Sequence, residues 1–484
     1  EVGIRKSLGA LRKQLVIQFI IESVIFNIVA AVLAIGLAYL LLPVLNQVFG
    51  KELAFDLIQL PAFWLLFIAV VLSGSILSGL YPALVLSGFK PISMLKGYRR
   101  SGKTTVLRQG LIVFQFVMSL LLLSATYLLV KQTSFMKNQD LGINLDKILI
   151  VSGPRATSDK DKSIEKFQTF RNELARHSSI HAVTGSLCVP GQFWMGAKRR
   201  PETAIENAPI SRGFYVTLNF ENTYDLEFLA GSPFRETMSD EEVNIINEAA
   251  LSTLGFETPE DAIGQKIVDN DEERPKTIVG VVKNFHWHSL HEGHMPYILG
   301  LYENRLTENI SIKLSTETLP ETLEHIEATF SDFFPGNPFD YYFADTAFNN
   351  EYRAEDQFKE IFLCFTLLAI VIACVGLLAL VSHSLSMKVK EIGIRKVLGA
   401  GIPGLMLLLS KEYMRLIFWA MLLSFPLVWY FGSDWLENYS YRISITFDLF
   451  IYPFMILVLI TLLTISRRTF LASRTNPVDS LRMD

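Results

Sequence analysis

The chain has 484 residues, of which 50% are hydrophobic, and a mean hydropathy of +0.32. A soluble protein of this length rarely has so apolar a composition, so the sequence favours an integral membrane protein. The formal net charge of −4 is too small to indicate a partner by charge alone, and we expect no nucleic-acid binding.

A ten-residue motif opens the chain and occurs again late in it. Residues 1–10 read EVGIRKSLGA and residues 391–400 read EIGIRKVLGA, with eight of the ten positions identical. The glutamate and arginine of each copy are spaced i and i+4, so they can meet on one face of a short helix. Apolar stretches follow each copy, which predicts two half-units with the same task at one face of a membrane.

Six apolar stretches are long enough, at about 20 residues each, to cross the ~30 Å hydrocarbon core of a bilayer as helices. The clearest, residues 361–381, contains no charged residue. In the second stretch, the Gly and Ser residues at 73–79 are small enough to let two helices approach closely. We expect spans near residues 22–45, 62–86, 108–130, 361–383, 413–433 and 448–466.

Residues 97–104, GYRRSGKT, match the P-loop pattern G-x-x-x-x-G-K-[ST]. A P-loop binds phosphate because it follows a buried strand and opens a helix whose amides face the ligand. Here the preceding segment is not such a strand, and a membrane span follows. We interpret the segment as a basic loop at the membrane interface and expect it to bind no nucleotide.

Basic residues cluster at 5–13, 90–108, 388–396 and 467–482. Cytoplasmic loops of membrane proteins carry an excess of Lys and Arg, so we place these four segments in the cytoplasm. Six spans then alternate without conflict, and the long polar insert lies outside. The predicted domains are residues 1–106 with a first motif and two spans, a span at 107–131, the insert at 132–358, and residues 359–484 with three spans and the second motif.

The insert has the pattern of an α+β domain. Amphipathic helices are expected at 159–177 and 318–333, where apolar residues recur on one helical face. Residues 346–360 read as a charged helix that continues without a break into the span at 361. Strands are expected at 181–186, 212–217, 243–247, 277–283, 308–314 and 339–344.

Four histidines and Glu292 gather in residues 286–294, HWHSLHEGH. Imidazole and carboxylate groups in a cluster suit zinc or copper. The alternative is a polar loop after the strand at 277–283, in which the histidines have ordinary structural roles. We favour the loop, and keep His286, His288 and His291 as the candidate metal ligands.

Four sets of segments carry a resemblance to a known family. They are the two motif copies; SGLYPALVLSGFKPISMLKG at 78–97 with TNPVDSLR at 475–482; INEAALSTLGFETPEDAIGQKI at 246–267; and TIVGVVKNFHWHSLHE at 277–292. In these the chain resembles the FtsX-like, MacB-type ABC transporter permeases, and especially the duplicated form common in Bacteroidetes. One departure is Ser232, where the family pattern Ala-Gly-Arg-x-Phe has Arg, so no role of that Arg is carried over.

The resemblance implies an α-helical polytopic membrane protein of the inner (plasma) membrane, with an extracytoplasmic domain of the MacB periplasmic-core type. It implies a non-catalytic permease that binds no cofactor, because a separate cytoplasmic ABC ATPase subunit binds ATP and Mg. Membrane lipid and a periplasmic adaptor protein are further partners that it suggests. The implied ATPase-coupling residues are Glu1, Gly3, Arg5, Lys6, Gly9 and Ala10, and in the second copy Glu391, Gly393, Arg395, Lys396, Gly399 and Ala400.

The task implied by the resemblance is mechanotransmission, in which ATP-driven closure of the ATPases moves the outer domain and exports a peptide, an antibiotic or a lipoprotein. Two alternatives stay open. One is a regulator that activates a cell-wall hydrolase by the same motion, and the other is a stand-alone membrane sensor. Because residue 1 is Glu and lies inside a motif whose second copy follows a full span, we expect a span and an outer domain to be missing upstream.

Overall fold

The structure, a computed structural model, describes residues 11–49, 54, 56, 59–88, 102–155, 160–192, 197–202, 210–239, 242–269, 274–304, 307–315, 318–387 and 402–473. The chain divides into two compact units, residues 1–116 and 117–484.

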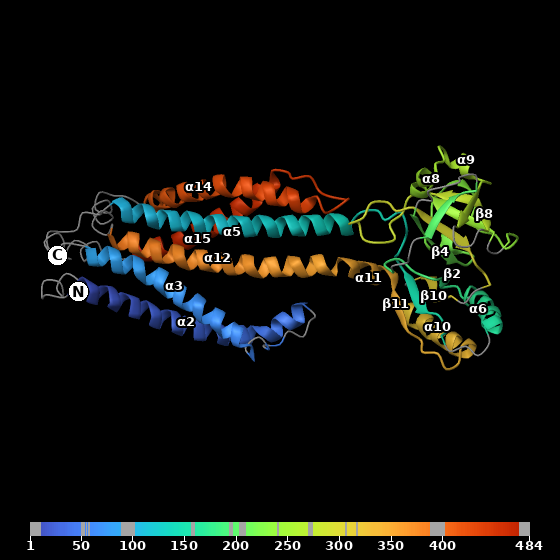
Figure 1. The fold of residues 1–484 in the computed structure, drawn as a ribbon, viewed down its shortest axis with the longest axis horizontal. Coiled ribbons are helices and arrows are strands. Elements are labelled where there is room, and N and C mark those ends of the chain that lie inside the picture. The colour runs from blue at the N-terminus through green and yellow to red at the C-terminus, as the bar shows by residue number, and fades with distance from the viewer. Residues whose placement is uncertain are drawn as a thin grey trace. The chain divides into compact units, whose positions relative to one another are not determined.

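Two apolar helices pair in the first unit. Helix α2 (Arg12–Phe49) and helix α3 (Pro61–Gly88) pack along each other (Figure 1). The Asn27 amide donates to Ser78 Oγ at 3.3 Å, and a Cβ atom on Gly79 would lie 2.9 Å from Ser23 Oγ. Gly79 therefore lies where the two helices come close together, which confirms the close approach predicted from the small residues at 73–79.

Long helices also make up much of the second unit, which holds α5 (Gly102–Lys137) from residue 117 onwards, α12 (Arg353–Met387), α14 (Ile402–Leu436) and α15 (Asp448–Ser473). Helix α15 packs against α12 and α14. The hydroxyls of Thr126 and Thr366 form a hydrogen bond of 2.8 Å between α5 and α12.

Among the described residues, six helices are long and apolar enough to cross a membrane. They are Lys13–Gln47, Pro61–Leu80, Gln109–Lys137, Ala344–Ser382, Ser410–Leu436 and Asp448–Ser466. Each overlaps one of the six spans expected from the sequence, so that prediction is confirmed, and the chain fits a multi-pass membrane protein.

A mixed sheet of 11 strands forms the domain between α5 and α12, here called the sheet domain (residues 148–343). The strand order is β11-β1-β10-β2-β4-β3-β7-β8-β6-β9, and β5 pairs with β8. Since β4 also pairs in parallel with β9, six of the strands close into a ring. The strands are β1 (Ile148–Ser152), β2 (Ile180–Ser186), β3 (Ala197–Pro201), β4 (Ile210–Val216), β5 (Phe228–Gly231), β6 (Val243–Asn247), β7 (Lys266–Asp269), β8 (Pro275–Val282), β9 (Tyr297–Leu301), β10 (Asn309–Leu314) and β11 (Tyr341–Phe343).

Among the described residues, six helices connect the strands of this domain or follow the last of them. They are α6 (Lys160–Leu174), α7 (Phe220–Thr223), α8 (Glu248–Leu254), α9 (Pro259–Ala262), α10 (Leu319–Phe333) and α11 (Ala344–Asn349), which follows the last strand. Helices α6 and α10 were both expected from their apolar faces, and that prediction is confirmed within a few residues.

Alternate residues of β1 belong to two different cores, as the two-residue period of a strand requires. Leu149 joins the core beneath α6 and α10, where the rings of Phe170 and Phe330 lie 6.0 Å apart, edge to face. Ile150 belongs to a second core, which also contains Trp287 of the loop after β8. This second core fixes the position of that loop.

The six strands predicted from the sequence correspond to β2, β4, β6, β8, β10 and β11. The charged helix expected at 346–360 does run into the span without a break from Arg353 onwards, because α12 continues to Met387, and only the part before Arg353 differs. Helix α11 ends at Asn349, and a 3₁₀ turn, η2 (Asn350–Tyr352), precedes α12. Both the turn and the start of α12 bind groups of the sheet domain, as described next.

Candidate functional site

The twelve predicted coupling residues lie outside the described residues. They are Glu1, Gly3, Arg5, Lys6, Gly9, Ala10, Glu391, Gly393, Arg395, Lys396, Gly399 and Ala400. The described chain instead presents a junction, where the loop at 284–294 after β8 meets several long helices at their ends next to the sheet domain.

The loop binds the 3₁₀ turn η2 and the first turn of α12. The Glu351 carboxylate accepts from the Ser289 backbone N–H and contacts His288 Nδ1 at 3.2 Å. The Leu290 backbone N–H donates to the Tyr352 hydroxyl at 3.1 Å. His291 Nε2 forms a further hydrogen bond with Glu355. Since these groups come from residues 351–355, the loop binds the start of α12 and the turn before it, which we call the head of α12.

The same loop binds the connection between α14 and α15. The ring of His291 stacks on Tyr439 with centroids 4.4 Å apart, and the Ser440 N–H donates to the His291 carbonyl at 3.1 Å. The hydroxyl of Tyr441 lies 2.7 Å from His294 Nε2. One short loop of the sheet domain thus contacts two separate helical elements.

Helix α5 joins the junction from its own last turns. Gln132 is fully buried; its amide donates to the Tyr441 carbonyl at 2.8 Å and its oxygen accepts from the Ile443 N–H at 3.0 Å. Lys131 pairs with Asp448 at the start of α15 at 2.6 Å. A further pair, Lys137 with Asp356 at 2.7 Å, links α5 to α12.

Aromatic packing anchors the loop in the sheet domain. Trp287 is 2% exposed, and its ring lies 4.4 Å from that of Phe214. Phe285 stacks on Tyr297 with centroids 5.2 Å apart. Gly142, with φ +70°, allows the loop to pass close by, because a Cβ there would lie 2.4 Å from the Asn284 carbonyl oxygen. The loop is therefore packed as part of the sheet domain.

Burial shifts the pKa values of two histidines of the loop and of the neighbouring Tyr439. Burial and the neighbouring His294 ring, 4.4 Å away, lower the pKa of His286 to about 4, so this imidazole is neutral near pH 7. Burial also lowers the pKa of His294. Burial raises the pKa of Tyr439 to about 12, which keeps its hydroxyl protonated.

The three candidate metal ligands do not converge. His286 packs against His294, His288 meets Glu351 and His291 meets Glu355. Within the described ranges, no three His, Cys, Asp or Glu residues are placed to share a metal ion. Each of the three candidate ligands therefore contacts a different side chain.

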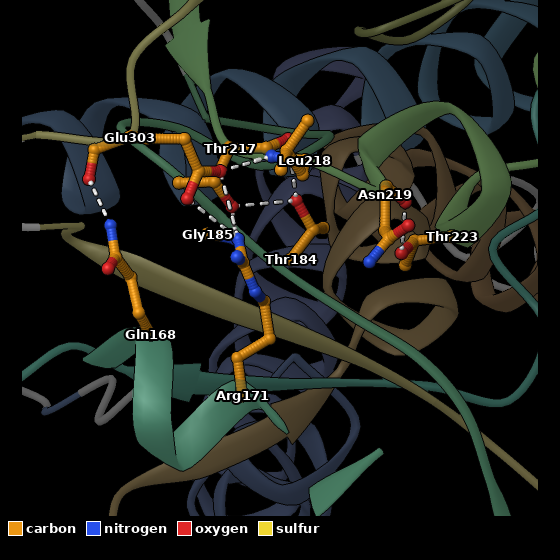
Figure 2. A network of polar contacts seen from close by, with 9 residues as sticks. All are labelled: Gln168, Arg171, Thr184, Gly185, Thr217, Leu218, Asn219, Thr223 and Glu303. Carbon is orange, nitrogen blue, oxygen red and sulfur yellow. Dashed lines mark hydrogen bonds and ion pairs between the residues drawn. The ribbon is translucent and has the colours of Figure 1, made fainter. Parts of the chain in front are cut away.

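A second polar cluster stiffens the sheet domain itself. Figure 2 shows Arg171 of α6 reaching Glu303, with Nη1 at 2.9 and 3.1 Å from the two carboxylate oxygens. Glu303 also accepts from the Leu218 N–H at 2.6 Å, and the Gly185 N–H donates to Thr217 Oγ1 at 2.7 Å. These bonds tie α6 to the turns after β4 and β9.

The sequence singled out the loop at 286–294 but not its partners. Gln132 carries one usable signal, because a polar residue at the end of an apolar span calls for a specific partner. Glu351, Tyr352 and Glu355 carry none, since a charged helix start is common. The P-loop match also receives no support as a phosphate site: Gly102–Thr104 open α5, and 97–101 lie outside the described residues.

Parts of the chain are similar to known proteins. A family model described as FtsX-like permease C-terminal matches residues 1–91 and 363–477. The periplasmic region of MacB from Actinobacillus actinomycetemcomitans is 14% identical over 44% of this chain and 96% of its own, with a TM-score of 0.31. The extracellular domain of the noncanonic ABC-type transporter YknZ from Gram-positive bacteria is 15% identical over 40% and 97%, with a TM-score of 0.29. No curated protein matches the chain.

Proposed function

Since residues 1–91 and 363–477 belong to the FtsX-like permease family, we propose that the chain is the membrane subunit of an ATP-driven transporter. A separate cytoplasmic ABC ATPase binds and hydrolyses ATP with Mg. The chain itself is not an enzyme: its role is to pass movement from that ATPase to the sheet domain, on the outer side of the inner membrane.

The junction is the observation that carries the proposal. The sheet domain is bonded through one loop to the head of α12 and to the α14–α15 connection, and Gln132 of α5 holds the same connection. Three helical elements that reach the membrane thus meet one rigid body. A shift of α12 relative to α5 and α15 must move the loop, and Trp287 passes the displacement into the core.

The input side of this mechanism is the repeated motif. Arg5 and Lys6, like Arg395 and Lys396, present cations that match acidic groups on an ATPase surface. Gly9 and Gly399 have no side chain, and glycine would suit a turn of the chain toward the next span. Two copies in one chain suit an ATPase dimer, with one copy for each subunit.

The output is work on a cargo or a partner outside, and we propose the export of a peptide, an antibiotic or a lipoprotein, helped by a periplasmic adaptor protein. The topology has a direct test. A Cys introduced at the exposed position Ser252 of α8 should react with an impermeant reagent that reaches the outer face of intact cells. Reaction only after lysis would refute the orientation.

Coupling is tested by Arg395→Glu and Gly399→Leu. If Arg395 forms a partly buried pair, reversing its charge should cost about 2–5 kcal/mol of ATPase binding, so the co-purified ATPase should fall at least about 30-fold. The matched control is Lys411→Glu, an exposed cation on α14 outside the motif. Limited proteolysis should show a folded sheet domain in all three variants.

Two outcomes would contradict the proposal. Wild-type ATPase binding and ATP-dependent activity in both motif variants would reduce the motif to a positive-inside anchor. Purification of the unmodified chain without any ATPase, under conditions that preserve its fold, would instead favour the stand-alone sensor.

A further inference from the structure

A cavity of about 610 Å³ lies between α5, α12 and α14 in the second unit. Its walls are apolar side chains such as Leu128, Phe358, Phe362 and Phe431. All three helices are long and apolar enough to span a membrane, and we infer that the cavity lies beside the acyl chains of the bilayer. In such a place, an apolar wall alone would attract any acyl chain without discrimination.

One charged residue breaks the apolar lining. Glu355 lines the cavity and is 8% exposed. Its Oε1 forms the hydrogen bond with His291, whereas its buried Oε2 has no hydrogen-bond partner within the described part of the chain. An ionised carboxylate accepts hydrogen bonds at both oxygens, and a buried acceptor without a donor is costly. The site therefore lacks a donor, and a cationic donor would suit it best.

Aromatic residues with polar groups lie at the same end of the cavity. Trp435 and Tyr439 both line it, and Tyr439 stacks on His291, the partner of Glu355. Such side chains favour the level where acyl chains give way to headgroups. An amphiphile whose chain fills the cavity would thus place its headgroup beside the carboxylate.

We propose that this cavity binds one phospholipid with a primary ammonium headgroup, of the phosphatidylethanolamine type. Its acyl chain packs among the apolar side chains of α5, α12 and α14. Its ammonium group, with three N–H donors and a positive charge, donates to Glu355 Oε2. A phosphatidylcholine headgroup has the charge but no N–H, so it cannot satisfy this oxygen.

The bound lipid would also stabilise the junction. Glu355 holds the loop at 284–294 through His291, and fixing the carboxylate from the lipid side orients the group that the loop binds. This consequence depends on the contacts of Glu355 alone and does not rest on the proposed coupling to an ATPase.

The test uses the purified full chain, stripped of lipid in detergent and incubated with phosphatidylethanolamine or phosphatidylcholine of identical acyl chains. Native mass spectrometry counts the lipids retained on each protein molecule. The wild type should retain one phosphatidylethanolamine with about tenfold or greater preference, the effect of one hydrogen bond to a charged group. Glu355→Gln should lose that preference. Glu360→Gln, the same change on α12 away from the cavity, should keep it.

Ala125→Phe provides a second variant that leaves Glu355 intact. Ala125 lines the cavity, so the larger ring should displace the acyl chain and remove the retained lipid of either type. Equal retention of both lipids by the wild type would overturn the proposal, as would a preference that survives Glu355→Gln. A preference unchanged by Ala125→Phe would place the lipid elsewhere and overturn it too, even if Glu355→Gln failed to fold.

Discussion

Replacing Gln132 with Leu should loosen the junction without touching the loop of the sheet domain. The Gln132 side chain is fully buried and makes two bonds to backbone groups of the α14–α15 connection, to the carbonyl of Tyr441 and from the amide of Ile443. Leucine has a similar size and is well tolerated in an apolar helix. The change therefore removes two hydrogen bonds and little packing.

The free-energy cost of Gln132→Leu follows from the two backbone groups that lose their hydrogen-bond partner. An unpaired buried backbone group costs about 1–3 kcal/mol, so two would cost about 2–6 kcal/mol. Tyr441 and Ile443 are only half-buried, so water can replace part of what is lost, and we expect the lower end. A cost of about 2 kcal/mol raises the open fraction of the connection about 30-fold.

Hydrogen exchange measures this opening directly. The Ile443 amide should exchange about 30-fold faster in Gln132→Leu, because its acceptor is gone and the connection opens more often. Gln115→Leu, the same substitution at a half-buried position of α5, should leave the exchange rate of the Ile443 amide unchanged. The hydroxyl of Tyr441 also binds His294, so ATP-dependent activity should fall together with the protection of the Ile443 amide from hydrogen exchange. Wild-type exchange at Ile443 in Gln132→Leu would refute the role assigned to this side chain.

Three further predictions concern other parts of the chain. Arg171→Met should destabilise the sheet domain by about 3 kcal/mol, because it leaves the carboxylate of Glu303 without its cation; Arg176→Ala, which breaks an exposed pair, should change the melting temperature little. The pKa of His286 is about 4 in the folded protein against about 6.5 in an unfolded chain. The neutral imidazole therefore makes its full contribution to the free energy of unfolding above about pH 6.5, and this contribution falls by up to about 3 kcal/mol as the pH drops toward 4. The melting temperature should be lower at pH 5 than at pH 7, and identical melting curves would contradict a buried neutral imidazole. Lys103→Ala should leave the ATPase activity of the assembled complex unchanged, and a loss of nucleotide binding with assembly intact would show that the P-loop match is functional.

Patterns carried along the whole length of an element were readable from the sequence. The six spans follow from apolar length alone, and α10 follows from Leu319, Leu323, Ile326 and Phe330 on one face. Among the strands that were not foreseen, β1 and β9 are short apolar runs without alternation, and β3 and β5 have no strand pattern. β3 reads AKRRP and β5 reads FLAG, and such segments become strands only because a neighbour offers hydrogen bonds.

The junction could be located only in part. The histidine-rich loop stood out by composition, but its chemistry was open because imidazole suits both metals and hydrogen bonds. The partners of His288 and His291 are Glu351 and Glu355, which lie more than 60 residues further along the chain. Gln132 lies more than 300 residues before its partners. No local spacing encodes pairs so far apart, and tertiary packing alone brings them together.

The position of β1 in the sheet has a consequence for biosynthesis. This strand lies between β10 and β11, so Ile150 pairs with Ser311 and Tyr342, which are made long after it. Pairing over such separations is slow, because a long loop must close before any bond forms. While the ribosome adds the intervening residues, β1 has unpaired edges and exposed apolar faces, which makes the nascent chain prone to aggregation. A chaperone that shields residues 148–152 until Phe343 has been made would raise the yield of folded protein, and a truncation before residue 309 would leave β1 without either partner strand.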